Sequence, residues 1–128
     1  MKKSLLLLAA LACTGAVAQE KEIWACQQLE STMLDWRSNG WEQYRVTPKP
    51  LLLTINGASS SYKEGDSELR IQCSPLEYFE ERTTCISSSG GNYFLLDPET
   101  GKMGRSRLSG AINNAYSVTA QIYNCTKF

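Results

Sequence analysis

Residues 90–111, GGNYFLLDPETGKMGRSRLSGA, predict a β-hairpin, and the rest of the expected fold extends outward from it. Its aromatic and aliphatic run, YFLL, is typical of a buried strand, and the segment KMGRSRL returns as a more polar strand. Between them, Asp97 can accept hydrogen bonds from backbone N–H groups, Pro98 restricts φ, and Gly101 can take a positive φ. These features predict a tight turn between antiparallel strands.

Alternating apolar and polar residues predict further strands on both sides of this hairpin. The most apolar strand is LLLTI at 51–55, and in 68–73 every second residue is apolar or cysteine. The Asn-Gly at 39–40 is typical of a hairpin turn, and Trp36 and Trp41 can pair across it. The expected strands cover residues 22–29, 33–37, 41–46, 51–55, 68–73, 83–86, 93–96, 102–108 and 116–125.

Two segments are expected to lie outside these strands. Residues 58–67 are rich in serine, glycine and charge, which is typical of a loop. Ser74, Pro75 and Glu77 have the pattern that begins a helix, so one or two helical turns are expected over 75–81. The sequence therefore predicts an all-β fold, a small antiparallel up-and-down barrel of about eight strands that removes its edges by closing. A β-sandwich is the alternative.

Residues 1–18 are typical of a secretory signal peptide, with two lysines, a short apolar run and a small-residue cleavage site that ends at Ala18. The predicted mature chain, residues 19–128, is a single disulfide-bonded β domain. Because the two lysines leave with the signal, 11 basic and 13 acidic residues remain, a net charge near −2. That charge argues against nucleic acid or an anionic membrane as the partner. No later stretch is apolar enough to span a bilayer.

The predicted location is therefore periplasmic or secreted. In the alternative, a loose lipobox leaves Cys13 as a lipid anchor at the mature terminus.

Four cysteines follow the signal, and an even number in an exported chain predicts two disulfides. Three pairings are possible. We expect Cys73 to pair with Cys85 across the short segment between them, and Cys26 to pair with Cys125, which would join the first strand to the last. A zinc site is the weaker alternative, because the chain has no C-x-x-C pair and no histidine.

The absence of histidine excludes Ser-His-Asp and Cys-His nucleophile systems and histidine-ligated metals. No other motif predicts an enzyme, a metal or a cofactor. The sequence predicts a non-enzymatic binding module for an unknown protein or small ligand. The alternatives are a periplasmic inhibitor of a hydrolase such as lysozyme, and a carrier of a small apolar ligand, because a barrel of about eight strands can enclose one small ligand.

The candidate partner-binding residues lie on the second strand of the hairpin and in the connection that follows it. Two arginines of that strand are expected to face solvent, where they could meet an acidic partner. The candidates are Arg105, Arg107, Ser109, Gly110 and Tyr116.

Scattered motifs across the mature chain resemble a group of short exported proteobacterial proteins of unknown function. The motifs are Trp24-x-Cys26-Gln27, Asp35-Trp36, Gly40-Trp41, Thr100-Gly101, Gly110-Ala111 and the closing CTKF. This resemblance implies export and a frame of four cysteines.

A second, partial resemblance is to periplasmic inhibitors of C-type lysozyme, which are small disulfide-bonded β-barrels that insert a Ser-Gly-x-x-Tyr loop into the lysozyme cleft. Ser109 and Gly110 begin such a loop here, but Asn113 stands at the tyrosine position and the next tyrosine is Tyr116. This resemblance implies an inhibitor of a hydrolase.

Overall fold

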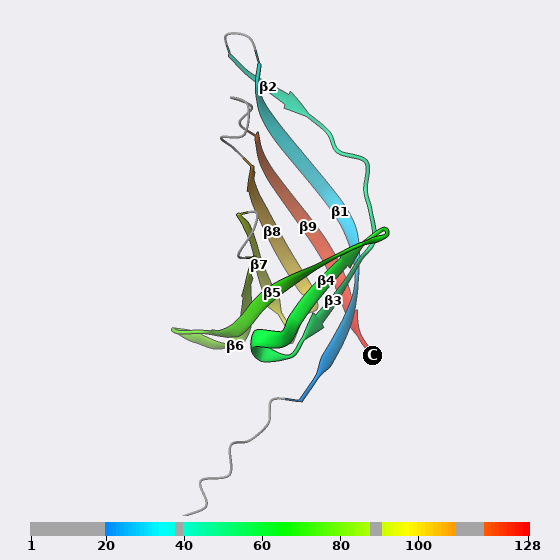
Figure 1. The fold of residues 1–128 in the computed structure, drawn as a ribbon, viewed down its shortest axis with the longest axis vertical. Helices are drawn as coiled ribbons and strands as arrows, with labels where there is room; N and C mark the ends of the chain where they lie inside the picture. Colours follow the sequence, from blue (N-terminus) through cyan, green and yellow to red (C-terminus); the bar gives the residue numbers. More distant parts are fainter. Residues whose placement is uncertain (1–19, 38–39, 88–90, 110–116) are drawn as a thin grey trace, which may run out of the picture.

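The computed structural model describes residues 20–37, 40–87, 91–109 and 117–128, and nearly all of them form antiparallel strands (Figure 1). The elements are β1 (Glu22–Arg37), β2 (Gly40–Tyr44), β3 (Leu51–Ile55), the 3-10 helix η1 (Gly57–Ser59), β4 (Ser60–Glu64), β5 (Ser67–Leu76), β6 (Phe79–Ile86), β7 (Asn92–Asp97), β8 (Lys102–Ser109) and β9 (Ser117–Lys127). No described segment is a helix with the length and apolar character needed to cross a bilayer.

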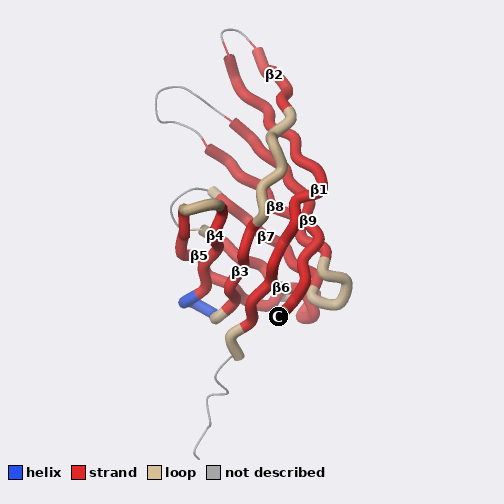
Figure 2. The backbone as a smooth tube through the Cα atoms, turned by 90° about the vertical axis from the view of Figure 1, so that its right-hand side faces the viewer, coloured by secondary structure: helices blue, strands red, loops and turns tan. Residues whose placement is uncertain are grey.

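Eight of the nine strands close into a barrel. From β3 to β9 each strand pairs with the next in the chain, and β1 completes the ring by pairing with both β3 and β9. The additional strand, β2, pairs with the second half of β1, and this hairpin extends beyond the rest of the barrel (Figure 2). The predicted barrel is therefore confirmed, and the sandwich alternative is wrong.

β1 is one strand of 16 residues, where the sequence predicted two strands at 22–29 and 33–37. β9 pairs with β1 along most of its length, and the register shifts once, between Gln28 and Glu30. A bulge of this kind bends a strand without ending it, so β1 can continue past the polar segment between the two predicted strands.

Both hairpins that the sequence predicts are confirmed. Trp36 lies directly opposite Trp41, and their ring centroids are 5.5 Å apart in an edge-to-face arrangement. In the β7–β8 turn, Oδ1 of Asp97 accepts hydrogen bonds from two turn N–H groups. The N–H of Gly101 donates to the carbonyl oxygen of Asp97 at 2.8 Å, and Gly101 has a φ of +69°.

Gly101 also lies against β9, because its carbonyl oxygen accepts a hydrogen bond of 2.7 Å from the N–H of Cys125. A Cβ at this position would collide with the carbonyl oxygen of Cys125. We therefore expect Gly101→Ala to lower the free energy of unfolding by about 2 kcal/mol, from the positive φ and the collision together. Urea denaturation measures this difference.

Two other glycines separate these causes. Gly65 has a φ of +61° with open space around it, so Gly65→Ala should cost about 1 kcal/mol from the backbone alone. Gly104 has neither feature, and Gly104→Ala should change stability by less than about 0.5 kcal/mol. Equal losses at all three glycines would contradict the proposed contact between Gly101 and β9.

Residues 58–67 are not a loop, because they contain β4 as well as part of η1. In β4, Ser60 and Tyr62 are buried, and they alternate with more exposed neighbours. The buried hydroxyl of Ser60 donates to the carbonyl oxygen of Gly57 at 2.7 Å and accepts from the N–H of Asn56 at 2.8 Å. These hydrogen bonds allow a serine-rich segment to enter the barrel wall.

The helical turns expected over 75–81 are also wrong, because β5 and β6 form a hairpin with a two-residue turn. Cys73 lies directly opposite Cys85, and their disulfide fixes the pairing of the two strands. Pro75 lies in β5 next to a register shift, where the missing N–H of a proline is tolerated.

Both disulfides have the predicted pairing. Cys26 and Cys125 are bonded across β1 and β9, which is where the barrel closes, and Cys73 and Cys85 are bonded across β5 and β6. All four sulfurs are thus occupied, so the zinc alternative is wrong.

The interior of the barrel is filled by apolar side chains and the two disulfides. Besides the cysteines, the buried core consists of Trp24, Leu51, Leu53, Ile55, Tyr62, Ile71, Phe94, Leu96, Met103 and Tyr123. On β9, the inward face carries Tyr123 and Cys125, whereas Ile122 on the outer face is 53% exposed.

The inward positions become polar beyond this core. Along β8 they pass from Met103 through Arg105 to Arg107, and along β9 from Tyr123 through Gln121 to Thr119. We call the buried polar residues at this level the polar layer; they are Gln28, Asn92, Arg105, Thr119 and Gln121. The fold thus places charged and amide side chains inside the barrel.

Candidate functional site

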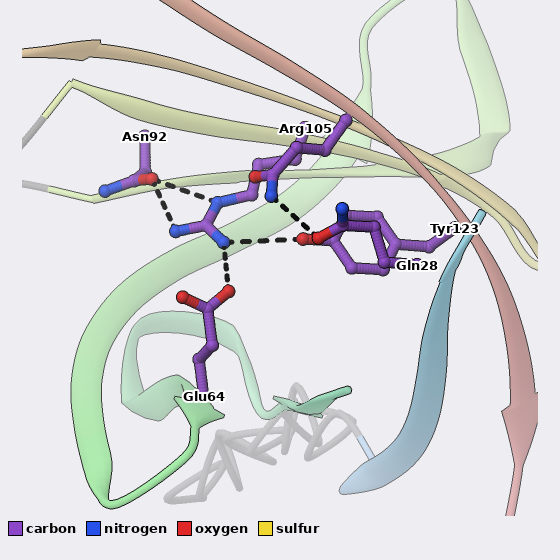
Figure 3. A network of polar contacts seen from close by, with 6 residues as sticks. Gln28, Glu64, Asn92, Arg105 and Tyr123 are labelled. Atoms are coloured by element: carbon purple, nitrogen blue, oxygen red, sulfur yellow. Dashed lines mark hydrogen bonds and ion pairs between the residues drawn. The ribbon is translucent and has the colours of Figure 1, made fainter. Parts of the chain in front are cut away.

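Arg105, on β8, is the centre of the polar layer, and its side chain is 3% exposed. Nε and Nη2 both donate to Oδ1 of Asn92, at 3.1 and 3.0 Å (Figure 3). Nη1 donates to Oε2 of Glu64 at 2.7 Å, which makes an ion pair. Asn92 begins β7 and Glu64 ends β4. The side chain of Arg105 therefore links β8 both to its neighbour β7 and to β4, which is adjacent to neither strand.

Aromatic rings enclose the guanidinium of Arg105. Its Cζ lies 5.0 Å from the ring centroid of Tyr62 and 5.2 Å from that of Phe94, within the range of cation–π contacts. Burial lowers the pKa of Arg105, but the hydrogen bond to Tyr123 and the charge of Glu64 outweigh it, and the net pKa is raised. Burial also raises the pKa of Tyr123, against the effect of Arg105. The arginine therefore stays charged and the phenol stays protonated at neutral pH.

A second polar contact joins β1 to β9. Nε2 of Gln121 donates to Oε1 of Gln28 at 2.9 Å. Gln28 is 4% exposed, and its own Nε2 has no hydrogen-bond partner among the described residues. A buried donor without a partner costs about 1–3 kcal/mol, so an acceptor supplied from outside would relieve that cost.

The polar layer opens into a pocket of about 170 Å³, which we call the mouth pocket. Its polar lining includes Gln28, Lys49, Glu64, Arg105, Arg107 and Gln121. The carboxylate of Glu64 already accepts from Arg105, whereas Lys49 and Arg107 have no ion-pair partner in the described part of the chain.

Positive charge predominates among the charged side chains of the mouth pocket. Three of its side chains are cationic and one is a carboxylate. Among the described residues, no group of three His, Cys, Asp or Glu side chains could hold a metal ion. Three donors of the pocket have no partner among the described residues: the ammonium of Lys49, the guanidinium of Arg107 and Nε2 of Gln28.

The structure separates the residues that the sequence proposed as a partner-binding set. The prediction that Arg105 faces solvent is wrong, because its position on β8 points inward and Glu64 and Asn92 satisfy its charge and donors. Arg107 is exposed, as predicted, and it lines the mouth pocket. Ser109 ends β8, whereas Gly110 and Tyr116 lie outside the described residues.

Five residues that the site uses were missed at the level of sequence: Gln28, Lys49, Glu64, Asn92 and Gln121. A signal existed for the two glutamines, because each lies an even number of residues from a cysteine of the same strand and so shares its inward face. Glu64 carried no comparable signal, since β4 and β8 come together only when the barrel closes. Asn92 lies opposite Arg107 in the β7–β8 hairpin, so it shares the inward face of Arg105, but its place at the start of β7 was outside the predicted strand.

The chain matches no protein-family model, no curated protein and no solved structure. We therefore infer the function from the geometry of the polar layer and the mouth pocket. The resemblances to short exported proteobacterial proteins and to lysozyme inhibitors stay expectations.

Proposed function

We propose that the protein is an exported, non-enzymatic binding module whose mouth pocket binds an anionic group, a carboxylate or a phosphate. One observation carries this proposal. The pocket gathers three groups that donate hydrogen bonds and have no partner among the described residues: Nε2 of Gln28, the ammonium of Lys49 and the guanidinium of Arg107. Oxyanions supply the charge and the acceptors that such donors need.

The size of the mouth pocket favours a small group. Its volume of about 170 Å³ is below the range of about 300–1,000 Å³ that is typical of sites for drug-sized ligands. The bound group would therefore be a small anion, or the acidic end of a larger molecule whose remainder lies outside the barrel.

Support for the other candidate functions is weaker. An apolar ligand inside the barrel has little room, because core side chains fill the interior and the pocket beside them is polar. The hydrolase-inhibitor alternative stays a prediction, because residues 110–116 lie outside the described part of the chain. Export is supported by the signal-like residues 1–18 and by two disulfides, which persist in oxidising compartments.

Titration with inorganic phosphate and with succinate, at constant ionic strength, tests the mouth pocket. In ¹⁵N-labelled oxidised protein, we expect a saturable shift of the side-chain amide resonances of Gln28. Arg107→Gln removes one cation from the pocket at an exposed position, so it should weaken binding about tenfold, which is about 1.4 kcal/mol.

Arg70→Gln is the matched control, because Arg70 is exposed on β5 and does not line the mouth pocket. It removes the same charge from the protein and should leave the affinity unchanged. Equal weakening by the two substitutions would mean that only net charge matters, and an unshifted Gln28 amide at saturating anion would also contradict the proposal.

A further inference from the structure

A groove of about 890 Å³ crosses four neighbouring strands on the outer face of the barrel. Its lining includes one row of directly opposed residues, with Thr126 on β9, Ala25 on β1, Leu52 on β3 and Lys63 on β4. This row lies on the outer face, because the neighbouring inward position Leu53 is fully buried. We call this hollow the outer groove.

The outer groove has an apolar floor. Ala25 is the smallest side chain of the row, so the surface of the sheet is lower there than at Leu52. Leu52 is 40% exposed, and Phe128, which also lines the groove, is 81% exposed. Apolar side chains gathered at a concave surface favour a ligand that can cover them.

The charged side chains of the outer groove have a single sign. Lys49 and Lys63 line it, and no acidic side chain does. Neither lysine has an ion-pair partner within the described ranges of the chain. Two unpaired ammonium groups beside an apolar floor are complementary to a ligand that carries both an apolar body and an acid.

We propose that the outer groove binds an amphipathic acid, a molecule with an apolar chain and a carboxylate or phosphate head. The chain lies over Ala25 and Leu52, and the head contacts Lys63 and Lys49. A volume of about 890 Å³ falls within the range of about 300–1,000 Å³ for small-molecule sites. The proposal is separate from the anion site, because Ala25, Leu52 and Lys63 do not line the mouth pocket, although Gln28 and Lys49 line both.

Fluorescence titration of the oxidised protein with a dansyl-labelled undecanoic acid tests the proposal. We expect saturable binding with a blue shift as the probe leaves water. The neutral methyl ester of the same probe keeps the apolar chain but loses the charge, so it should bind about tenfold more weakly.

Two substitutions with matched controls locate the site. Ala25→Leu fills the floor and should weaken binding of the acid at least about tenfold, whereas Ala120→Leu, at an exposed position of β9 outside the groove, should not. Lys63→Gln should weaken binding of the acid about threefold without affecting the ester, whereas Lys21→Gln, at an exposed position outside the groove, should affect neither.

Several results would overturn the proposal. The acid and the ester could bind with equal affinity, or the Ala25→Leu variant could bind the acid as tightly as the wild type does. A substitution in the groove could also weaken binding of the acid no more than its control substitution does. Binding to phosphatidylglycerol vesicles without binding of the monomeric acid would assign the groove to a membrane surface instead. A dimer in sedimentation experiments that Ala25→Leu dissociates would assign it to a second copy of the chain. Arg107→Gln should leave the acid bound, so failure of the anion site and failure of this site are distinguishable.

Discussion

Replacing Cys26 and Cys125 together by alanine is expected to lower the free energy of unfolding by about 4–5 kcal/mol. This disulfide joins residues 99 positions apart, so it removes a large loop-closure entropy from the unfolded chain. The bond between Cys73 and Cys85 spans 12 positions, and its loss should cost about 3 kcal/mol in the same chain-entropy model.

The two disulfides make a fair comparison, because all four cysteines are buried and each pair bridges directly opposed strand positions. The apolar volume that alanine leaves empty is therefore similar at both sites. Guanidinium denaturation of the oxidised wild type and the two double variants gives the three free energies. If loss of the shorter bridge costs as much as loss of the longer one, loop length does not control stability, and the seam between β1 and β9 is held by its hydrogen bonds and packing.

Local patterns were sufficient to predict the strands and turns that depend on neighbouring residues. The β7–β8 turn follows from Asp97 and Gly101, whose backbone roles involve residues within the same turn. The Trp36–Trp41 pair likewise spans a single hairpin. The disulfide pairing could be predicted because cysteine number and spacing leave few arrangements, and because a closed barrel brings its first and last strands together.

Composition was misleading where a polar residue is satisfied by a partner within the fold. The serines of β4 suggested a loop, but Ser60 is buried with both of its hydrogen bonds made by the adjoining η1 segment. At 75–81, a proline that often begins a helix lies instead beside an irregularity in β5. In both cases the strand ladders on either side determine the conformation more strongly than local composition does.

The inward position of Arg105 could not be predicted from its surroundings in the sequence. Its partners Asn92 and Glu64 lie 13 and 41 residues away. Asn92 lies on the adjoining strand of the β7–β8 hairpin, whereas Glu64 on β4 reaches Arg105 only when the barrel is closed. The same strand carries Arg107, which is exposed two positions later. An alternation rule places both arginines on one face, but it cannot say how far along the strand the barrel interior gives way to solvent.

Arg105→Ala is therefore expected to lower the free energy of unfolding by about 3 kcal/mol, whereas Arg107→Ala should change it by less than about 0.5 kcal/mol. Removing the guanidinium leaves Oδ1 of Asn92 and the carboxylate of Glu64 without their partner inside the polar layer. The side chain of Glu64 is 24% exposed and can recover some hydration, which is why the lower end of the range for broken buried ion pairs applies. Urea denaturation of both variants measures the contrast.

A double variant identifies the cause of that loss. Adding Glu64→Gln to Arg105→Ala removes the uncompensated charge, so it should restore about 1 kcal/mol, whereas Glu64→Gln alone should destabilise the wild type. Purely additive losses of stability would mean that the ion pair contributes nothing and that Arg105 acts through its packing on Tyr62 and Phe94.

If Arg105→Ala lowers the free energy of unfolding as little as Arg107→Ala does, both arginines lie in solvent. The mouth pocket would then lack its inner wall, so stability measurements on these variants test the site as well as the fold.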